Sequence, residues 1–251
     1  MRFSIAIPAH DRGENGPLWM RELLNSIKSQ TFLDLEIVVS DQSRNDNILD
    51  VCREYSDDFD FKYLRYGGSV PCENINTALD ECEGDIIKLM FSDDIFISND
   101  ALEIIHNEYE KTKCKWAFSG FCGTKDGKNF YDHKTPKWTD YMLEGRNLLS
   151  SPSVVSFLNS SKQHFDENLK LLLDTEFYHR MRWENGMPHI IEEVLVANRD
   201  HDNRISSHQT SQYDAIVEHP DGSWMINRSE YEYVQNKHRE FCINRKYPDE
   251  N

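Results

Sequence analysis

The sequence lacks several features that would assign it to a common class of protein. It has no apolar run of the roughly 18–20 residues that a membrane-spanning helix needs, and its N-terminal apolar stretch is too short for a signal peptide. It also lacks the glycine-rich loops of P-loop and dinucleotide-binding enzymes and the GxSxG turn of α/β-hydrolases. The six cysteines form no CxxC pair, which argues against a zinc site and favours reduced thiols in a cytoplasmic protein.

Positive charge is scarce. Lys and Arg total 28 against 44 for Asp and Glu, which gives a formal net charge of -16. A field of this sign repels phosphate backbones and anionic lipid, so we expect no nucleic-acid partner and no binding to an anionic membrane surface. A nucleotide remains possible, because a few local cations and a divalent metal can reverse the field inside one cleft.

The first part of the chain alternates between two hydrophobic periods. The expected strands are 3–9, 36–40, 61–66 and 85–91, and the expected helices are 17–27, 46–55, 72–83 and 99–113. This alternation predicts an α/β fold with a mainly parallel sheet. Because ligands of such sheets gather beyond the carboxyl ends of the strands, the polar residues that follow the strands are expected to cluster.

The second part is less regular, and no repeat or low-complexity linker divides the chain. The expected elements are a strand at 115–123, a turn at 125–128, a helix at 174–185 ended by Gly186, a strand at 189–196 and a C-terminal helix at 230–245. The stretch from 130 to 161 shows no clear period. We therefore expect one compact domain of 251 residues.

Acidic residues follow two of the predicted strands. Asp93 and Asp94 are adjacent, and neighbouring carboxylates repel each other unless a cation, such as Mn²⁺ or Mg²⁺ with its preference for oxygen ligands, neutralises them. Asp41 follows another strand, where a carboxylate can accept hydrogen bonds from a nucleobase or a ribose. The alternative for all three is a structural role in a turn or a helix cap.

Two later segments carry further candidates. Asp174 opens the helix at 174–185 and is either a simple N-cap or, if it faces a cleft, a general base for an acceptor hydroxyl. His201 can complete a metal site, and Arg204 can bind diphosphate oxygens. The alternative for both is a solvated polar loop.

Taken in order, these segments resemble the family 2 glycosyltransferases, which have the GT-A fold. The resemblance covers about residues 1–207. In the first part of the chain, Pro8 to Arg12 is similar to a Pro-x-x-Asn-Arg turn with Asp11 in place of Asn, and Asp41-Gln42-Ser43 is similar to an Asp-x-Ser strand ending. Asn74 matches the helix before the metal strand, and Ser92-Asp93-Asp94 stands in the place of an Asp-x-Asp metal motif. Later, Asp174 to Arg180 is similar to the segment with the catalytic base, and His201 with Ser206 is similar to a late His-x-x-x-x-Ser element.

The resemblance implies a role for each matching residue. The residues implied at the nucleotide are Pro8, His10, Arg12, Asp41, Ser43, Asn74 and Asp93, with Asp41 on the base; Asp94 and His201 are implied at the metal, Arg204 at the diphosphate and Asp174 as the base. The implied cofactor is Mn²⁺ or Mg²⁺. Two positions depart from the family pattern. Phe91 stands where many members have the first Asp of the metal motif, and Leu173 replaces the Glu before the base, which is expected to raise the pKa of Asp174.

The resemblance also implies an architecture and an activity. The single domain, 1–251, would have a nucleotide-sugar-binding half at 1–113, an acceptor and catalytic half at 114–207, and a C-terminal helical extension at 208–251. The activity would be inverting, metal-dependent transfer of a hexosyl-type sugar from a UDP-linked donor to a hydroxyl of a glycan or glycolipid acceptor, in cytoplasmic polysaccharide biosynthesis.

Two alternatives remain open. A degenerate GT-A-like domain would bind a glycan or a partner without turnover, and the absence of an acidic residue at Phe91 favours it. A sugar nucleotidyltransferase would need a glycine-rich, cationic first loop, which residues 10–14 match poorly.

Overall fold

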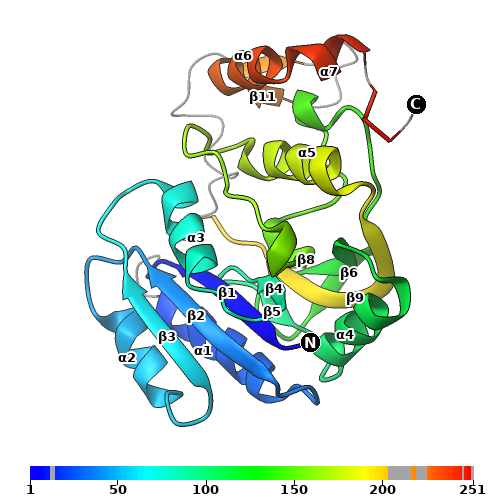
Figure 1. Ribbon diagram of the computed structural model, residues 1–251. Helices are drawn as coiled ribbons and strands as arrows, with labels where there is room; N and C mark the ends of the chain where they lie inside the picture. The colour runs from blue at the N-terminus through cyan, green and yellow to red at the C-terminus, as the bar shows by residue number, and fades with distance from the viewer. Residues whose placement is uncertain (12–14, 203–215, 219–224, 245, 250–251) are drawn as a thin grey trace.

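A central β-sheet with helices on both faces organises the chain (Figure 1). The computed structural model describes residues 1–11, 15–202, 216–218, 225–244 and 246–249. The helices are α1 (Gly16–Lys28), α2 (Asn47–Glu54), α3 (Pro71–Asp80), α4 (Ala101–Thr112), α5 (Leu173–Asn185), α6 (Arg228–Lys237) and α7 (Arg239–Asn244), with short 3-10 helices η1 (Met142–Glu144), η2 (Pro152–Val154) and η3 (Asn159–Ser161).

The strands of the first half pair in parallel, as the sequence predicts. The main sheet has the order β3-β2-β1-β4-β8-β6-β9-β5, and β7 pairs with β6. The parallel strands are β3 (Asp60–Arg65), β2 (Leu35–Asp41), β1 (Phe3–Ala9) and β4 (Ile86–Leu89). β1 and β2 are buried along nearly their whole length, which explains their continuous apolar sequence.

The second half adds strands of mixed direction. These are β5 (Ile95–Phe96), β6 (Trp116–Thr124), β7 (Phe130–Lys134), β8 (Val155–Leu158) and β9 (His189–Arg199). β8 runs antiparallel between β4 and β6, whereas β9 is parallel to β6. The sequence does not predict β8 or β5, because runs of four and two residues show no period. A separate antiparallel pair joins β10 (Ile216–Glu218) and β11 (Met225–Asn227).

The helix boundaries follow from local sequence. Pro17 lies in the first turn of α1, where its missing N–H costs no hydrogen bond, and Leu23, Leu24 and Ile27 form part of the buried face. α5 ends at Gly186, whose φ of 82° is accessible to glycine at little cost. One expectation is wrong in detail: the predicted helix at 230–245 is divided into α6 and α7 at His238.

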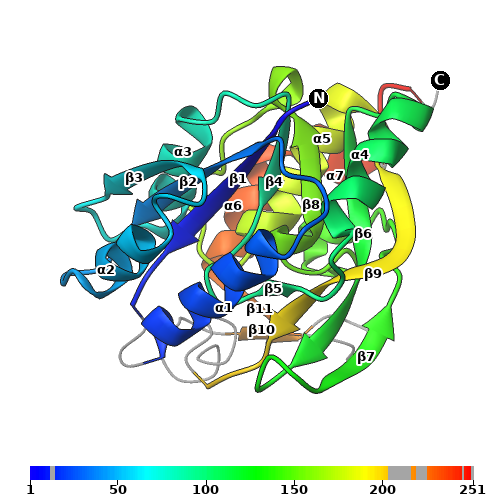
Figure 2. The ribbon, with the colours of Figure 1, turned by 90° about the horizontal axis from the view of Figure 1, so that it is seen from below.

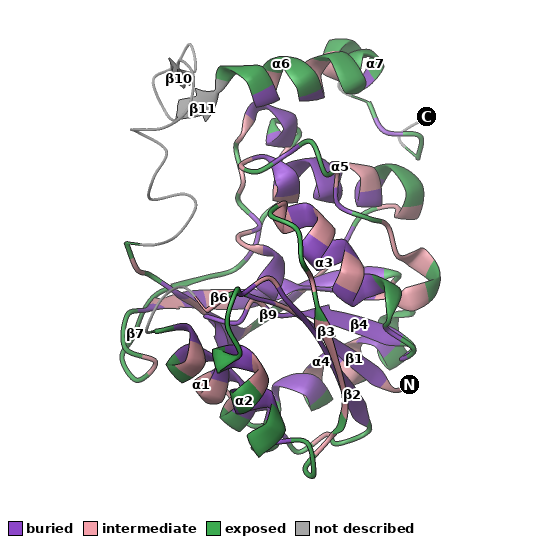
Figure 3. Cartoon of the chain, turned by 90° about the vertical axis from the view of Figure 1, so that its left-hand side faces the viewer, coloured by how far each residue is buried: buried purple, intermediate pink, exposed green. Residues whose placement is uncertain are grey.

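The helices form layers above and below the sheet. Figure 2 shows α1 and α4 crossing one face, and Figure 3 shows α3 and α5 on the other, with α6 and α7 packed beyond α5. The six cysteines are free thiols, and four of them are fully buried, as small hydrophobic residues commonly are. No helix among the described residues is long and apolar enough to cross a bilayer.

Candidate functional site

A cleft of about 1160 Å³ opens at the carboxyl ends of β1, β2 and β4. Five of the residues predicted at the nucleotide line it, namely Pro8, His10, Ser43, Asn74 and Asp93. Phe91 and Leu173, the two departures from the family pattern, also line it. The predicted clustering of polar residues beyond the strand ends is therefore observed. Arg12 lies outside the described residues.

The cleft also contains residues that sequence analysis missed. Arg65 and Tyr66, at the end of β3, line the cleft beside Gly67 and Gly68. The same strand-end rule that singled out Asp41 applies to β3, so this position could have been found from the sequence. Together with Arg44, which also lines the cleft, Arg65 places two cationic side chains at the cleft of an acidic protein.

Asp41 lies beneath the cleft and is fully buried. Its Oδ1 accepts a hydrogen bond of 2.8 Å from the Ser43 amide, and its Oδ2 accepts one of 2.6 Å from the Tyr63 hydroxyl. Burial and this hydrogen bond raise the pKa of Tyr63. Arg65 is 3.3 Å from the same oxygen of Asp41. Asp41 is not among the described residues that line the cleft. Its hydrogen bond from the Ser43 amide holds the loop after β2 in place.

Asn74 joins the ends of two strands at the cleft. Its Oδ1 accepts a hydrogen bond of 2.6 Å from Ser40 on β2, and its Nδ2 donates one of 3.3 Å to the Ala9 oxygen on β1. Ser43 extends this framework, because its hydroxyl accepts a hydrogen bond of 2.8 Å from the Asp11 amide. The loops after β1 and β2 are thus held to each other.

The predicted metal motif meets the end of β9. Nε2 of His201 is 2.8 Å from Oδ2 of Asp93, and the His201 ring packs on Trp19 with a centroid distance of 4.4 Å. Asp94 is buried, and its Oδ1 accepts a hydrogen bond of 2.8 Å from the Arg199 amide. The structure therefore brings Asp93, Asp94 and His201 into one region. Arg204 lies outside the described residues.

Arg199 is a further residue of this site that sequence analysis did not assign. Its buried guanidinium donates from Nε to the main-chain oxygen of Asp93 at 2.8 Å and from Nη1 to the main-chain oxygen of Lys125 at 3.4 Å. Its Nη2 donates to the side chain of Glu22. The guanidinium therefore ties the metal-motif turn to α1 and to the hairpin after β6. The available signal was an arginine at the end of the strand, shortly after the apolar run 194–197, because a buried cation needs partners.

Carboxylates and an imidazole are suitable ligands for a divalent ion, but this set does not enclose one. Among the described residues, no group of three His, Cys, Asp or Glu side chains is arranged to hold a metal. Ions such as Mg²⁺ are commonly bound by one or two carboxylates together with substrate phosphates. The donor set of Asp94, Asp93 and His201 fits an ion shared with a diphosphate.

Asp174 lies next to Leu173 at the start of α5. Its Oδ2 accepts a hydrogen bond of 2.6 Å from Asn147, and its Oδ1 accepts one of 2.7 Å from the Thr175 amide. Burial raises the pKa of Asp174 to about 6. The N-cap of α5 is Leu172, so the alternative that Asp174 is itself the N-cap is wrong. A carboxyl that titrates near neutrality is well suited to exchange protons.

The C-terminal helices hold α5 in place. Glu230 of α6 accepts hydrogen bonds from the amides of Lys170, Leu171 and Leu172, at 3.0, 2.9 and 2.9 Å. Glu176 of α5 is fully buried. Its Oε1 is 2.9 Å from Nε2 of His238 and 2.8 Å from Nζ of Lys237. The segment that leads into Asp174 is thus fixed by residues more than fifty positions later in the chain.

Burial alone would raise the pKa of Glu176, but hydrogen bonds from His238 and Arg180 lower it to about 2. Glu176 therefore stays ionised at neutral pH and serves as the anionic centre between α5 and α6. Its position four residues before Arg180 matches the predicted segment, in which these two residues form a helical ion pair of 2.8 Å.

The sequence matches the family model described as "Glycosyl transferase family 2" over residues 4–171, which is more than half of the chain. No curated protein matches the chain. Solved structures do share its fold. The structure of Staphylococcus aureus TarS 1–349 in complex with UDP-GlcNAc matches with a TM-score of 0.66 and 17% identity, covering 97% of this chain and 73% of that one.

Two further structures are similar. TarS 1–349 in complex with UDP has a TM-score of 0.64 and 20% identity, covering 80% of this chain and 61% of that one. The mannosyltransferase PcManGT from Pyrobaculum calidifontis, in complex with GDP-Man and Mn²⁺, has a TM-score of 0.59 and 14% identity, covering 80% of this chain and 58% of that one. This chain thus spans about 60% of the length of these two solved chains. The curled, mainly parallel sheet flanked by helices is the GT-A fold, and the chain belongs to glycosyl transferase family 2.

Proposed function

We propose that this protein transfers a sugar from a nucleotide-sugar donor to a hydroxyl group of a glycan or glycolipid acceptor, with inversion at the anomeric carbon. The observation that carries the proposal is the position of Asp174. This carboxyl follows Leu173, which lines the cleft at the strand ends, and burial raises its pKa to about 6. These observations support Asp174 as the proposed general base, beside the lining of the cleft.

The proposed step is a single displacement. Asp174 takes the proton of the acceptor hydroxyl, whose oxygen forms a bond to the anomeric carbon while the bond from that carbon to the diphosphate oxygen breaks. The diphosphate leaves with the electron pair of the broken bond. Attack from the opposite face inverts the anomeric configuration. The hydrogen bond from Asn147 orients the carboxyl, so the base needs little reorganisation before proton transfer.

The proposed donor carries UDP. Two of the similar structures contain UDP or UDP-GlcNAc, whereas the third contains GDP-Man. We therefore propose uracil as the nucleobase of the donor. Pro8, His10, Ser43, Asn74 and Asp93 would contact the nucleotide from the cleft wall. For Asp41 to contact the nucleobase directly, its carboxylate would have to give up the hydrogen bond from Tyr63 and accept one from the nucleobase instead. Arg12 and Arg204 are proposed at the nucleotide and the diphosphate on sequence grounds alone.

A divalent ion, Mn²⁺ or Mg²⁺, is proposed to bind at Asp94 and His201, with Asp93 beside it. When bound, such an ion neutralises the negative charge that develops on the diphosphate leaving group. The chain's own contribution is to hold the carboxylates in place, since Arg199 fixes both the main chain of Asp93 and the side chain of Asp94.

We propose the cytoplasm as the place of action, because all six cysteines are free thiols and unpaired cysteines are typical of a reducing compartment. The degenerate-domain alternative still has support in Phe91, which lines the cleft where many relatives have an acidic ligand. The nucleotidyltransferase alternative has less support, because residues 10–14, directly after β1, are a poor match to a glycine-rich, cationic loop.

The experiment is a thermal-shift titration with UDP, GDP and dTDP, with and without Mn²⁺, on the wild type and on Asp94→Ala. Stabilisation by one nucleotide that needs both Mn²⁺ and Asp94 is expected, because a ligand that binds only the folded state raises its stability. Release of UDP from UDP-sugars in water then tests turnover. The absence of any nucleotide effect would overturn the transferase. Binding without UDP release or transfer would favour the degenerate domain.

A further inference from the structure

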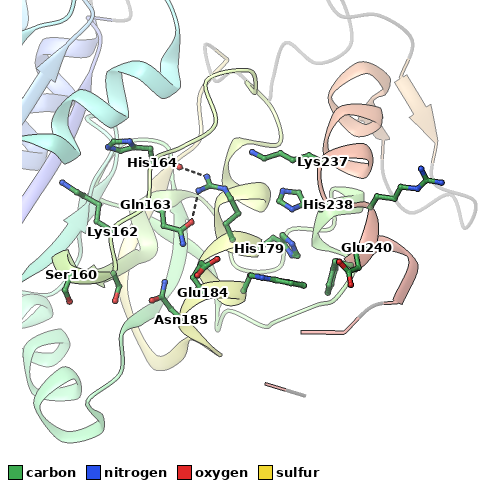
Figure 4. Close-up of a pocket in the computed structure, with 15 residues that line it drawn as sticks. Ser160, Lys162, Gln163, His164, His179, Glu184, Asn185, Lys237, His238 and Glu240 are labelled. Carbon is green, nitrogen blue, oxygen red and sulfur yellow. Dashed lines mark hydrogen bonds between the residues drawn. The ribbon is translucent and has the colours of Figure 1, made fainter. Parts of the chain in front are cut away.

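A second cavity, of about 820 Å³, lies between residues 160–164, α5 and the junction of α6 with α7 (Figure 4). Among the described residues, it shares no lining residue with the cleft at the carboxyl ends of β1, β2 and β4, which is the proposed donor cleft. Nothing in the proposed transfer step uses it. Its lining combines one exposed aromatic ring with amide and carboxylate groups, and the chemistry of that combination decides what it can bind.

The aromatic ring is that of Trp183. It is 37% exposed, whereas Trp19 and Trp116 are buried and Trp138 is half-buried. The Trp183 ring rests edge-on against Phe241, with a centroid distance of 6.5 Å and an interplanar angle of 86°. A large apolar ring that is backed by another ring and left open to a cavity offers a rigid surface to an apolar ligand face.

Three of the basic side chains around the cavity are paired with one buried carboxylate. Arg180, Lys237 and His238 all bind Glu176, at 2.8, 2.8 and 2.9 Å. Arg180 also donates to the Gln163 side-chain oxygen at 2.8 Å, as Figure 4 shows. Lys162 and His164 lie 3.8 and 2.7 Å from Asp80. The exposed Arg239 is offset in the lining by the carboxylates of Glu184 and Glu240, so the lining as a whole does not favour an anionic ligand.

The remaining polar groups suit an uncharged, hydroxyl-rich ligand. Because the Gln163 oxygen accepts from Arg180, its amide nitrogen remains as a donor. Glu184 and Glu240 are exposed, line the cavity and form no ion pair with another described residue, so their oxygens remain as acceptors. A sugar presents C–H groups to an aromatic ring and hydroxyl groups to amides and carboxylates. The cavity offers both kinds of contact.

We propose that this cavity binds a sugar unit of the glycan acceptor, remote from the hydroxyl that reacts. Calling this glycan the acceptor rests on the proposed function. Trp183 lies nine residues after Asp174 on the same helix, which corresponds to about 14 Å along its axis. The sugar held at Trp183 is therefore a different unit from the one at the base. The site selects acceptors of more than one sugar and holds the growing chain.

The test uses the full chain and tetrasaccharides of N-acetylglucosamine, glucose, mannose and galactose, with binding measured by saturation-transfer NMR and calorimetry. The wild type is expected to bind at least one of them. Trp183→Ala should weaken that binding about tenfold or more through loss of the ring surface, whereas Trp183→Phe should retain most of it. Phe130→Ala, which removes an equally exposed ring on β7, is the matched control and should bind like the wild type.

The outcomes are distinct. If no tetrasaccharide binds, if Trp183→Ala binds as tightly as the wild type, or if inorganic phosphate competes with the sugar, the proposal is overturned. Thermal unfolding checks that each variant folds, and Glu184→Gln, an exposed change, tests the site if Trp183→Ala does not fold. Release of UDP from UDP-sugars should be unchanged in Phe130→Ala, which lies outside both sites. Sugar binding that depends on Trp183, without any such release in the wild type, would refute the transferase but keep the sugar site.

Discussion

Nε of Arg199 donates a hydrogen bond of 2.8 Å to the main-chain oxygen of Asp93, while the amide of Arg199 donates one of 2.8 Å to the Asp94 carboxylate. One residue of β9 thus fixes both members of the acidic pair that follows β4. Because these two strands are not neighbours in the sheet, Arg199 is one link between their ends at the site, and the contact of His201 with Asp93 is another.

Arg199→Ala removes the bond from Nε to Asp93 and keeps the amide bond to Asp94. It should therefore impair metal-dependent nucleotide binding without removing any proposed ligand. We expect loss of the Mn²⁺-dependent part of the UDP thermal shift. The free energy of unfolding should fall by about 1.5–3 kcal/mol, the value of hydrogen bonds to a charged group. Urea denaturation and calorimetry measure the two effects. Glu22→Gln is the control, since it leaves the Arg199 bond to Asp93; equal UDP affinity in Arg199→Ala and Glu22→Gln would contradict the positioning role.

Asp174→Asn should lower kcat by about 10²–10⁴ with little change in UDP affinity, because a general base contributes to the chemical step. In the wild type the base must be ionised. With its pKa raised to about 6, transfer should increase with pH up to about 6 and then level off. Rate profiles between pH 5 and pH 8 check this. Glu192→Gln, an exposed change on β9, should behave as the wild type. A profile without a step near pH 6 would refute the assignment.

The same carboxyl makes a prediction about stability. The pKa of Asp174 is raised from its ordinary value of 3.8 to about 6 in the folded chain, so the folded state binds the proton more tightly. Stability from this group is present below about pH 4 and is lost as pH rises through 6. Between pH 4 and pH 7 the wild type should lose about 1–3 kcal/mol of unfolding free energy because Asp174 ionises. Asp174→Asn cannot ionise at this position, so it should not show this loss and should gain the same amount relative to the wild type. Urea denaturation at both pH values measures it.

Glu230→Gln should loosen the segment before Asp174. The Glu230 carboxylate accepts hydrogen bonds from the amides of Lys170, Leu171 and Leu172. A neutral side-chain amide has only one oxygen to accept these bonds, so we expect a loss of about 1–3 kcal/mol. Hydrogen exchange of those three amides should accelerate, and kcat should fall more than UDP affinity. Glu232→Gln, an exposed change on the same helix, is the control; equal exchange in the two variants would rule out the predicted role.

Phe91→Asp should strengthen Mn²⁺ binding. Phe91 and Asp93 both line the donor cleft, so a carboxylate at position 91 adds a third acidic group to the metal motif. We expect the Kd for Mn²⁺, measured by calorimetry with UDP present, to fall about tenfold, which corresponds to about 1.4 kcal/mol. Phe91→Asn, which is polar but uncharged, should change it much less. Unchanged affinity in Phe91→Asp would mean that this position does not face the ion.

Sequence patterns predicted the first half of the chain well because the information there is local. β1 and β2 are buried apolar runs, and each leads directly into polar residues that line or support the cleft. The contact between Asp93 and His201 joins positions 108 residues apart, and only the family resemblance indicated it. Glu230 could not be assigned in this way, since its partners are main-chain amides that carry no sequence signal. Arg199 could be noticed as a cation at the end of a buried strand, but its partners, among them Glu22, lie far away in the sequence.

The second half was less predictable for a related reason. The four residues of β8 acquire their strand conformation by pairing with β4 and β6, not from a period of their own. The division of the C-terminal helix at His238 accompanies contacts with Glu176, which lies 62 residues earlier. The roles of Arg12 and Arg204 remain predictions from the sequence.

The place of β8 in the sheet has a consequence for how the protein folds during synthesis. β4, which precedes the acidic pair, pairs on one side with β1 and on the other with β8, and β8 is translated almost seventy residues later. Until β8 emerges from the ribosome, β4 is an open edge that can pair with another nascent chain. The first half of the chain is therefore not a module that can be excised or exchanged between relatives, since β4 completes its pairing only when the second half has been made.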